Sequence, residues 1–413
     1  MPDSQRILLL REYTLYIFQQ LGKALENHQN ETNGANANFQ KALSVMRERE
    51  RQLRDAELSL AVTAPMKAGK STILNAIIGD GILPSRALAM TVLPTRVQLC
   101  QDQEDPKLLL SQAFYDAMKE FLDADEFNEV NWGNNGIVTG AEQIRQTLTI
   151  LNDKVRSSLQ QSKKLRMPLD GKDIPVVYAK LPTYLRRSEG ASGSMPKGSL
   201  VLIDTPGPNE ANIGEALQVI VRSILQEVSM VAVVLDYTQL TSEAAELTKN
   251  EVKTIASIIG NDNVIYLVNK VDQRRPGDLT TKGVEDFISQ SYEDNAESGD
   301  NLFEISASKG YAAGGFIRAV TGRSLQDEDM RKMPSAISLA QELYELWEDE
   351  LEDATVDLFN KKATRLWSNS GIEQFLAVCI EELTGRAYEK TVYTSIDYLG
   401  TSNNQQFAGS LRA

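Results

Sequence analysis

The sequence predicts an α/β protein with a mainly parallel sheet, helices on both faces of that sheet, and a flanking helical bundle or neck. Two observations lead to this fold class. From residue 58 onward, short apolar segments alternate with stretches of helical periodicity, the pattern typical of parallel sheets. Before and after this region, apolar residues recur only at helical spacing, which indicates helices that pack against one another.

Six short aliphatic segments are the expected strands of the sheet. They are 58–63, 95–100, 200–203, 228–235, 264–268 and 302–305. A helical insertion of about residues 102–172 separates the second strand from the third, with helices expected near 109–122 and 141–165. A strand-like segment follows it at 174–181. We expect one large domain over residues 58–385 to contain the sheet and this insertion.

The two ends of the chain are expected to form the flanking bundle. Residues 1–57 would supply two N-terminal helices, the first capped by Ser4, with a polar loop at 27–38 between them. Residues 386–413 would supply a C-terminal bundle helix and the start of a truncated or missing stalk. The apolar stripes of these segments complement one another, so we expect them to pack together.

Composition excludes several classes of chemistry. The formal charge of −14 argues against direct nucleic-acid binding through net electrostatics. A single histidine, His28, leaves no histidine cluster for metal binding. The two cysteines give no disulfide framework, and no stretch has the length of a membrane span or the form of a secretory signal. These features predict a cytoplasmic protein whose chemistry uses lysines, hydroxyls, carboxylates and backbone amides.

A strand–loop–helix segment has the form of a phosphate-binding loop. Ala64-Pro65-Met66-Lys67-Ala68-Gly69-Lys70-Ser71 follows the first strand and opens an apolar helix, with Ala64 in place of the usual first glycine. Backbone N–H groups and the helix N-terminus would surround phosphates with partial positive charge. Lys70 would reach the β- and γ-phosphates and Ser71 would ligate Mg²⁺. The residues expected to bind nucleotide here are Ala64, Met66, Lys67, Ala68, Gly69, Lys70, Ser71 and Thr72.

Three later motifs predict that the bound nucleotide is GTP or GDP. In Asp204-Thr205-Pro206-Gly207, Asp204 would hold Mg²⁺ through water and the Gly207 N–H would meet the γ-phosphate. In Asn269-Lys270-Val271-Asp272, the Asp272 carboxylate would accept hydrogen bonds from guanine N1 and the exocyclic amine, which adenine does not supply in that arrangement. Ser306-Ala307-Ser308 would close the base pocket through the Ala307 amide. Each motif follows a strand, at the end where open sheets bind ligands.

A mobile threonine that senses the γ-phosphate is expected between the first two strands. Thr91 is the choice and Thr95 is the alternative; either hydroxyl would otherwise only cap or edge the following strand. The predicted metal ligands are therefore Ser71, Thr91 and Asp204.

These strings resemble those of bacterial dynamin-like GTPases, and most of all the replication-factor-colocalising, clamp-binding branch. The resemblance rests on residues 66–72, 90–95, 204–211, 235–240 and 268–270, and it runs from about residue 38 to about residue 399. It implies a large GTPase with Mg²⁺ as cofactor, activated through dimerisation of its GTPase domain. It also implies assembly at lipid membranes by the full-length protein and a peripheral location at the inner face of the cell membrane.

The resemblance leaves the protein partner unidentified, because no clamp-binding peptide of the Gln-Leu-x-Leu-Phe type is found near the N-terminus. The alternative function is a GTP-dependent scaffold or regulator at replication or division machinery, with slow hydrolysis.

The resemblance also bears on hydrolysis. Pro208 stands where Ras-like proteins place a water-orienting glutamine. Lys67 is a candidate substitute, because guanylate-binding proteins carry a charge-neutralising arginine at this place in the loop. Lys67 would otherwise point to solvent or contact a second protomer. The residues expected to act in catalysis are Lys70, Lys67 and Thr91.

Overall fold

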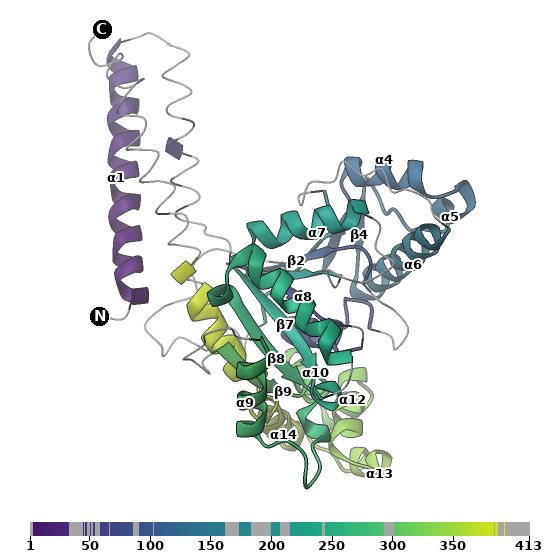
Figure 1. The fold of residues 1–413 in the computed structure, drawn as a ribbon. Helices are drawn as coiled ribbons and strands as arrows, with labels where there is room; N and C mark the ends of the chain where they lie inside the picture. The colour runs from purple at the N-terminus through teal and green to yellow at the C-terminus, as the bar shows by residue number, and fades with distance from the viewer. Residues whose placement is uncertain are drawn as a thin grey trace. The chain divides into compact units, whose positions relative to one another are not determined.

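The computed structural model describes most of the chain (Figure 1). The described residues are 3–32, 44, 46–47, 50, 53, 58–65, 67–85, 91–101, 103–161, 173–182, 200–206, 215–241, 244–292, 301–383, 385–386 and 392. By its internal contacts the chain divides into two compact units. The larger unit comprises residues 60–187 and 201–376, and the smaller unit comprises residues 1–59, 188–200 and 377–413.

The larger unit is built on a nine-stranded sheet with the order β4-β3-β5-β2-β6-β1-β7-β8-β9. The pairs β1–β7, β2–β5, β7–β8 and β8–β9 are parallel, whereas β3 pairs antiparallel with both β4 and β5. The strands are β1 Leu58–Thr63, β2 Thr95–Cys100, β3 Lys107–Leu109, β4 Ile137–Thr139, β5 Val176–Lys180, β6 Leu200–Asp204, β7 Met230–Asp236, β8 Val264–Asn269 and β9 Leu302–Ile305. The prediction of a mainly parallel sheet is confirmed.

The central strands are fully buried, which explains their continuous aliphatic sequence. Every residue of β1, β6 and β8 is buried, as expected for strands with helices on both faces. β6 and β8 each run one residue further than their apolar segments, so that the buried polar residues Asp204 and Asn269 end them. Functional side chains therefore begin where the strands end.

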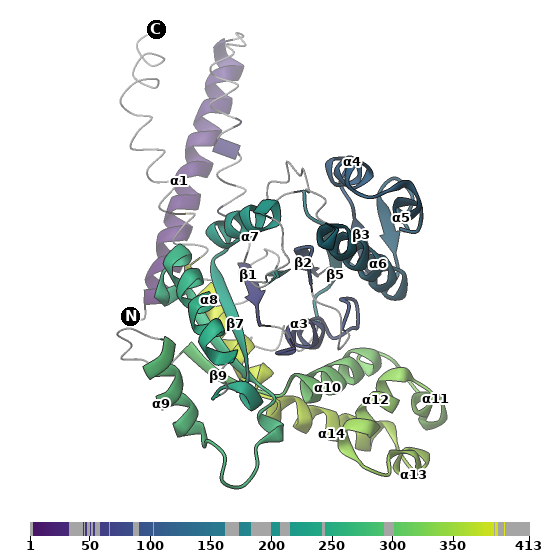
Figure 2. The same cartoon turned by 45° about the vertical axis from the view of Figure 1, so that its right-hand side comes forward.

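Helices surround the sheet in two groups (Figure 2). The helices α7 Glu215–Glu227, α8 Ala244–Ile259 and α9 Thr281–Tyr292 pack in sequence along one side. On the other side, α10 Ala307–Val320 contacts both α3 Lys70–Ile78 and α14 Val356–Asn369. The short 3₁₀ segments are η3 Tyr237–Gln239, η4 Asn261–Asn263 and η5 Val271–Gln273.

The insertion after β2 contains strands as well as helices. Its elements are β3, α4 Gln112–Phe121, α5 Ala124–Asn128, β4 and α6 Ala141–Gln160. The helix expected near residue 109 begins only at Gln112, because Leu109 belongs to β3 and the Ser111 side chain accepts a hydrogen bond from the Phe114 N–H. The antiparallel pair β3–β4 extends the parallel sheet at this edge.

A second hydrophobic cluster follows α10. It is formed by α10, α11 Asp327–Arg331, α12 Pro334–Leu343, α13 Trp347–Glu352 and α14. The rings of Phe316 and Phe359 lie at its centre, fully buried and edge to face at 5.9 Å. A further helical segment covers residues 372–383.

The smaller unit contains a long N-terminal helix, α1 Asp3–Thr32. The expectation of a loop from residue 27 is wrong for residues 27–32, because these polar residues include no glycine or proline and the helix continues through them. Ser4 lies inside the helix rather than at its cap. Phe18 packs with Met46, Leu53 and Val392 in a buried cluster. The segments 33–43 and 393–413 of the expected bundle lie outside the described residues. No helix in the described part of the chain is both long and apolar enough to span a bilayer.

Candidate functional site

The loop after β1 contains two backbone conformations that favour particular residues. Lys67 has a φ of 65°, which is uncommon for a residue with a side chain, and Gly69 has a φ of 95°. A Cβ atom at Gly69 would lie 2.2 Å from the Asn269 Nδ2 atom, so only glycine fits there. Ala64 and Ala68 are buried, whereas Lys67 is exposed. Met66 lies outside the described residues. The loop is thus shaped to turn tightly into α3, which begins at Lys70.

Asn269 connects this loop to the loop after β9. Its Nδ2 group donates to the Ala68 carbonyl at 2.8 Å, and its Oδ1 atom accepts from the Ala307 N–H at 2.9 Å. The side chain is 2% exposed, so both bonds are shielded from water. The Ala307 N–H, which the sequence analysis assigns to the base, is donated to Asn269 in this structure. Asn269 therefore acts as a bridge between two loops.

Three predicted residues converge where β1 and β6 end. The Lys70 ammonium forms an ion pair with the Asp204 carboxylate and donates to Thr91 Oγ1 at 2.9 Å. Thr91 Oγ1 in turn donates to Asp204 Oδ2 at 3.0 Å. Thr95, the alternative threonine, is buried at the start of β2 with its hydroxyl directed to the Leu93 carbonyl at 3.4 Å. The structure thus brings Thr91, and not Thr95, to Lys70 and Asp204.

The donor set at this point suits Mg²⁺. Thr91 and Asp204 present hard oxygen atoms around one position that already attracts a cation, and Ser71 follows Lys70 directly in α3. Within the described ranges there is no cluster of three or more His, Cys, Asp or Glu side chains that could hold a metal by itself. A magnesium ion here would therefore depend on two hydroxyls, one carboxylate and ligands from outside the protein.

The residue after Asp204 fixes β6 against β1. Both the N–H and the hydroxyl of Thr205 donate to the Val62 carbonyl, at 3.2 and 3.0 Å, and Thr205 is fully buried. These two hydrogen bonds to one carbonyl oxygen set the direction in which the chain leaves the sheet. Gly207, expected to meet the γ-phosphate, lies outside the described residues.

The residues assigned to the base lie beyond β8 and β9. Lys270 has a φ of 68°, and its Nζ atom pairs with Asp236 Oδ2 at 2.5 Å, which joins the ends of β8 and β7. Asp272 lies in η5 with its carboxylate exposed. Ser306 is buried before α10, and Ser308 is exposed in its first turn. Of the predicted base-binding residues, Asp272 and Ser308 are therefore accessible to a ligand. Lys270 is paired with Asp236, and Ser306 is buried.

Arg274 supports this loop and was missed by the sequence analysis. Its guanidinium group bonds both carboxylate oxygens of Glu304 in β9 and lies 4.8 Å from the centre of the Tyr237 ring. The Glu304 hydrogen bonds raise the pKa of Arg274 further above its ordinary value. The Tyr237 hydroxyl donates to the Leu279 carbonyl at 2.8 Å. No local sequence signal marks Arg274, because its partners, in η3 and β9, are at least 30 residues away in the sequence.

Two buried asparagines hold the chain on either side of residues 86–90. On one side, Asn75 of α3 donates to the Leu83 carbonyl and accepts from the Leu83 N–H, both at 2.9 Å. On the other side, Asn152 of α6 accepts from the Val92 N–H at 2.7 Å and the Leu93 N–H at 3.1 Å. Asn152 thus fixes the backbone directly after Thr91. Neither asparagine belongs to a phosphate or base motif, so no sequence pattern marks either of them.

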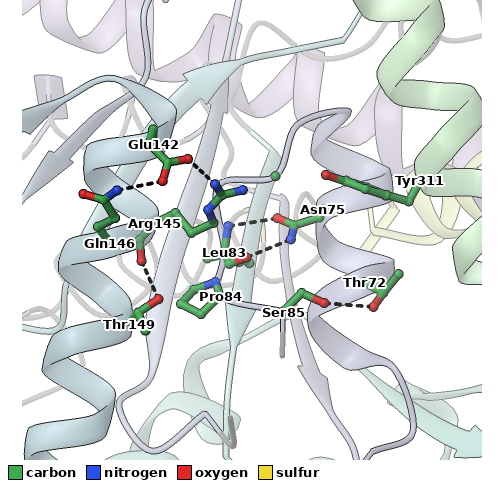
Figure 3. Close-up of a pocket in the computed structure, with 11 residues that line it drawn as sticks. Thr72, Asn75, Leu83, Pro84, Ser85, Glu142, Arg145, Gln146, Thr149 and Tyr311 are labelled. Carbon is green, nitrogen blue, oxygen red and sulfur yellow. Dashed lines mark hydrogen bonds and ion pairs between the residues drawn. The ribbon is translucent and has the colours of Figure 1, made fainter. Parts of the chain in front are cut away.

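A cavity of about 440 Å³ lies beside the first of these anchors (Figure 3). It separates α3 from α6 and is bordered by Tyr311 of α10. On its α3 side the hydroxyls of Thr72 and Ser85 lie 3.2 Å apart, and on its α6 side Arg145 pairs with Glu142 of the same helix. Burial raises the pKa of Tyr311, and the Asp80 carboxylate raises it further. Polar side chains line this cavity, and it adjoins the helix that carries Lys70.

The role of Asn152 as an anchor gives a first prediction. Replacement of Asn152 by alanine leaves two buried N–H groups without their acceptor, so we expect a loss of about 1–3 kcal/mol in the free energy of unfolding. Urea denaturation measures it. Asp153→Ala is the matched control, because Asp153 lies on the same helix with its side chain 48% exposed, and its change should stay within about 0.5 kcal/mol. Equal effects of the two substitutions would refute the anchoring role.

Comparison with known proteins identifies relatives of the chain. The profile described as Dynamin family matches residues 60–270, just over half of the chain. The clamp-binding protein CrfC of Escherichia coli is 32% identical over 292 residues, an alignment that covers 64% of this chain and 38% of CrfC. The chain thus spans well under half of that relative.

Similar solved structures belong to bacterial dynamins. One is described as an oligomerised bacterial dynamin pair that senses and tethers membranes. Its superposition covers 96% of this chain and 57% of that structure's chain, with 14% identity and a TM-score of 0.38. The LeoA bacterial dynamin GTPase from ETEC covers 97% of this chain and 48% of its own length, with 10% identity and a TM-score of 0.42. On the match over residues 60–270, the chain belongs to the dynamin family.

Proposed function

We propose that this dynamin-family chain binds GTP with Mg²⁺ and hydrolyses it to GDP and phosphate. The convergence of Lys70, Thr91 and Asp204 at the ends of β1 and β6 is the observation that carries the proposal. An ammonium group beside a buried carboxylate and a hydroxyl, at the start of a helix, is the arrangement that phosphoryl transfer requires. Family membership supports the same activity.

The nucleotide's phosphates and metal would be divided among a few residues. Ser71, Thr91 and Asp204 would hold Mg²⁺, which neutralises charge on the β- and γ-phosphates when bound. Lys70, now paired with Asp204, would turn to the phosphates, and the backbone N–H groups around Gly69 would face the same oxygens. The loop that contains Thr91 would respond to the γ-phosphate because Thr91 already contacts Lys70 and Asp204.

Guanine selection would rest on Asp272. Its carboxylate is exposed in η5, and Arg274 and Lys270 hold that segment by their bonds to Glu304 and Asp236. A carboxylate that loses its water on ligand binding requires donors in return, and guanine supplies two of them at its N1 and exocyclic amine. Adenine presents an acceptor at N1. The ion pairs of Arg274 and Lys270 would fix the backbone on both sides of Asp272, so that its carboxylate could not turn away from an unsuitable base.

Two consequences of family membership belong to this proposal. The GTPase domain would dimerise, and the full-length protein would assemble on membranes at the inner face of the cell membrane, in the cytoplasm. A second candidate is a GTP-dependent scaffold with slow hydrolysis at replication machinery. It is favoured by one observation, the name of a relative at 32% identity, a clamp-binding protein.

The dependence of hydrolysis on protein concentration separates the two candidates. If dimerisation completes the catalytic site, the turnover per protein molecule should rise at least fivefold between about 0.1 and 10 µM protein, since dimer occupancy follows mass action over such a range. Phosphate release under saturating GTP and Mg²⁺ measures it. A turnover that is slow and constant over this range would favour the scaffold instead.

Lys67 gives a second prediction within this proposal. Its side chain is exposed at a backbone φ of 65°, next to the expected phosphate position, so it is free to stabilise charge in the transition state. Lys67→Ala should lower kcat at least tenfold, which corresponds to an activation free energy higher by roughly 1.4 kcal/mol or more. The Kd for GTP should stay within about twofold of the wild-type value.

Single-turnover hydrolysis and equilibrium binding measure these two quantities. Lys282→Ala is the control for the loss of one exposed lysine of the same unit, on α9. An equal loss of binding and turnover in Lys67→Ala would contradict a role confined to the transition state.

A further inference from the structure

Glu342 stands out among the carboxylates near the expected base. It lies in the last turn of α12, a helix of the second hydrophobic cluster rather than of any nucleotide motif. Its Oε1 atom lies 3.3 Å from the Ser308 hydroxyl, which donates to it. Ser308 lies in the first turn of α10, directly after β9, so α12 contacts the edge of the expected base site.

A second observation links Glu342 to Asp272 through their charges. Burial raises the pKa of Glu342, and the negative charge of Asp272 raises it further, whereas the Ser308 hydrogen bond and Lys309 oppose the shift. Two carboxylates from separate elements, η5 and α12, therefore repel each other electrostatically. In the described part of the chain, no lysine or arginine forms an ion pair with Glu342. A half-buried carboxylate held in place by a hydroxyl alone is costly, which is more typical of functional positions than of packing.

We propose that Glu342 is a specificity-determining residue for the base, acting with Asp272 at the hydrogen-bonding edge of guanine. This inference rests on the proposed function. Two neighbouring carboxylates make this edge strongly favourable for hydrogen-bond donors and unfavourable for acceptors. Guanine presents donors at N1 and at the 2-amino group. Xanthine carries a carbonyl acceptor at the 2-position, which both carboxylates would disfavour, so the change in its rejection when Glu342 loses its charge measures the contribution of the second carboxylate.

The test compares xanthosine triphosphate with GTP, by displacement of a fluorescent GDP analogue in the presence of Mg²⁺. Glu342→Gln keeps the shape of the side chain and an acceptor for Ser308 but removes the charge. We expect it to lower the preference for GTP over xanthosine triphosphate about fivefold, since the loss of one carboxylate weakens a nearby electrostatic discrimination by about that factor. Ser308→Ala, which frees the carboxylate without removing it, should lower the preference less.

Glu345→Gln is the matched control, because Glu345 is an exposed carboxylate three residues further along the chain. Its preference should equal that of the wild type. A preference in Glu342→Gln within twofold of the Glu345→Gln value, with a normal melting temperature and intact GTP binding, would overturn the inference alone. If neither GTP nor xanthosine triphosphate displaced the analogue from the wild-type protein, the proposed function would be overturned, and this inference with it.

Discussion

The side-chain amide of Asn269 is the interaction on which the rest of the site depends. It joins the phosphate loop at Ala68 to the loop after β9 at Ala307, and its Nδ2 atom occupies the space that any side chain at Gly69 would need. One fully buried amide thus fixes the separation of two loops that would serve opposite ends of a nucleotide. It can do so because β8 and β9 are parallel and paired to their ends, with Asn269 opposite Ile305.

The same sheet geometry explains why the anchors of the site come from distant parts of the chain. The chain is held at Leu83 by Asn75 from α3, and directly after Thr91 by Asn152 from α6, about 60 residues later. The insertion that carries α6 therefore helps to position Thr91. A change in the position of Thr91 would be transmitted through Val92 and Leu93 to this helix, and Ser85 offers a second route to α3 through Thr72.

Local patterns predicted the parts of the structure that depend on local chemistry. The strands β1, β2 and β9 match their expected residues. β1 is buried on both faces and is therefore apolar almost throughout, whereas β2 and β9 alternate buried and partly exposed residues with the period of two typical of a strand. The turn from β1 into α3 was also predicted, and its glycine is required by the close approach of Asn269. The sequence also favoured Thr91 over Thr95 as the threonine at this site, and the structure brings Thr91 to Lys70 and Asp204.

Contacts between separate elements gave no such signal. Arg274, Asn152 and Glu342 act on partners 30, 59 to 60 and 34 residues away, and their neighbours in sequence do not distinguish them from ordinary surface or helix residues. The short strands β3 and β4 were missed for a related reason, since three residues are too few to show a period of two. The end of α1 was misjudged because polar composition alone does not stop a helix.

In the proposed function, a phosphate-binding loop around Lys70 and a carboxylate at Asp272 would act together to select one nucleotide. Parallel titrations of the protein with GTP and ATP, each with Mg²⁺, test it most directly. We expect saturable binding of GTP, and binding of ATP weaker by a factor of about 100 or more, because adenine leaves the carboxylate unpaired. Binding of ATP as tight as that of GTP, or no binding of either nucleotide with Mg²⁺ present, would contradict it.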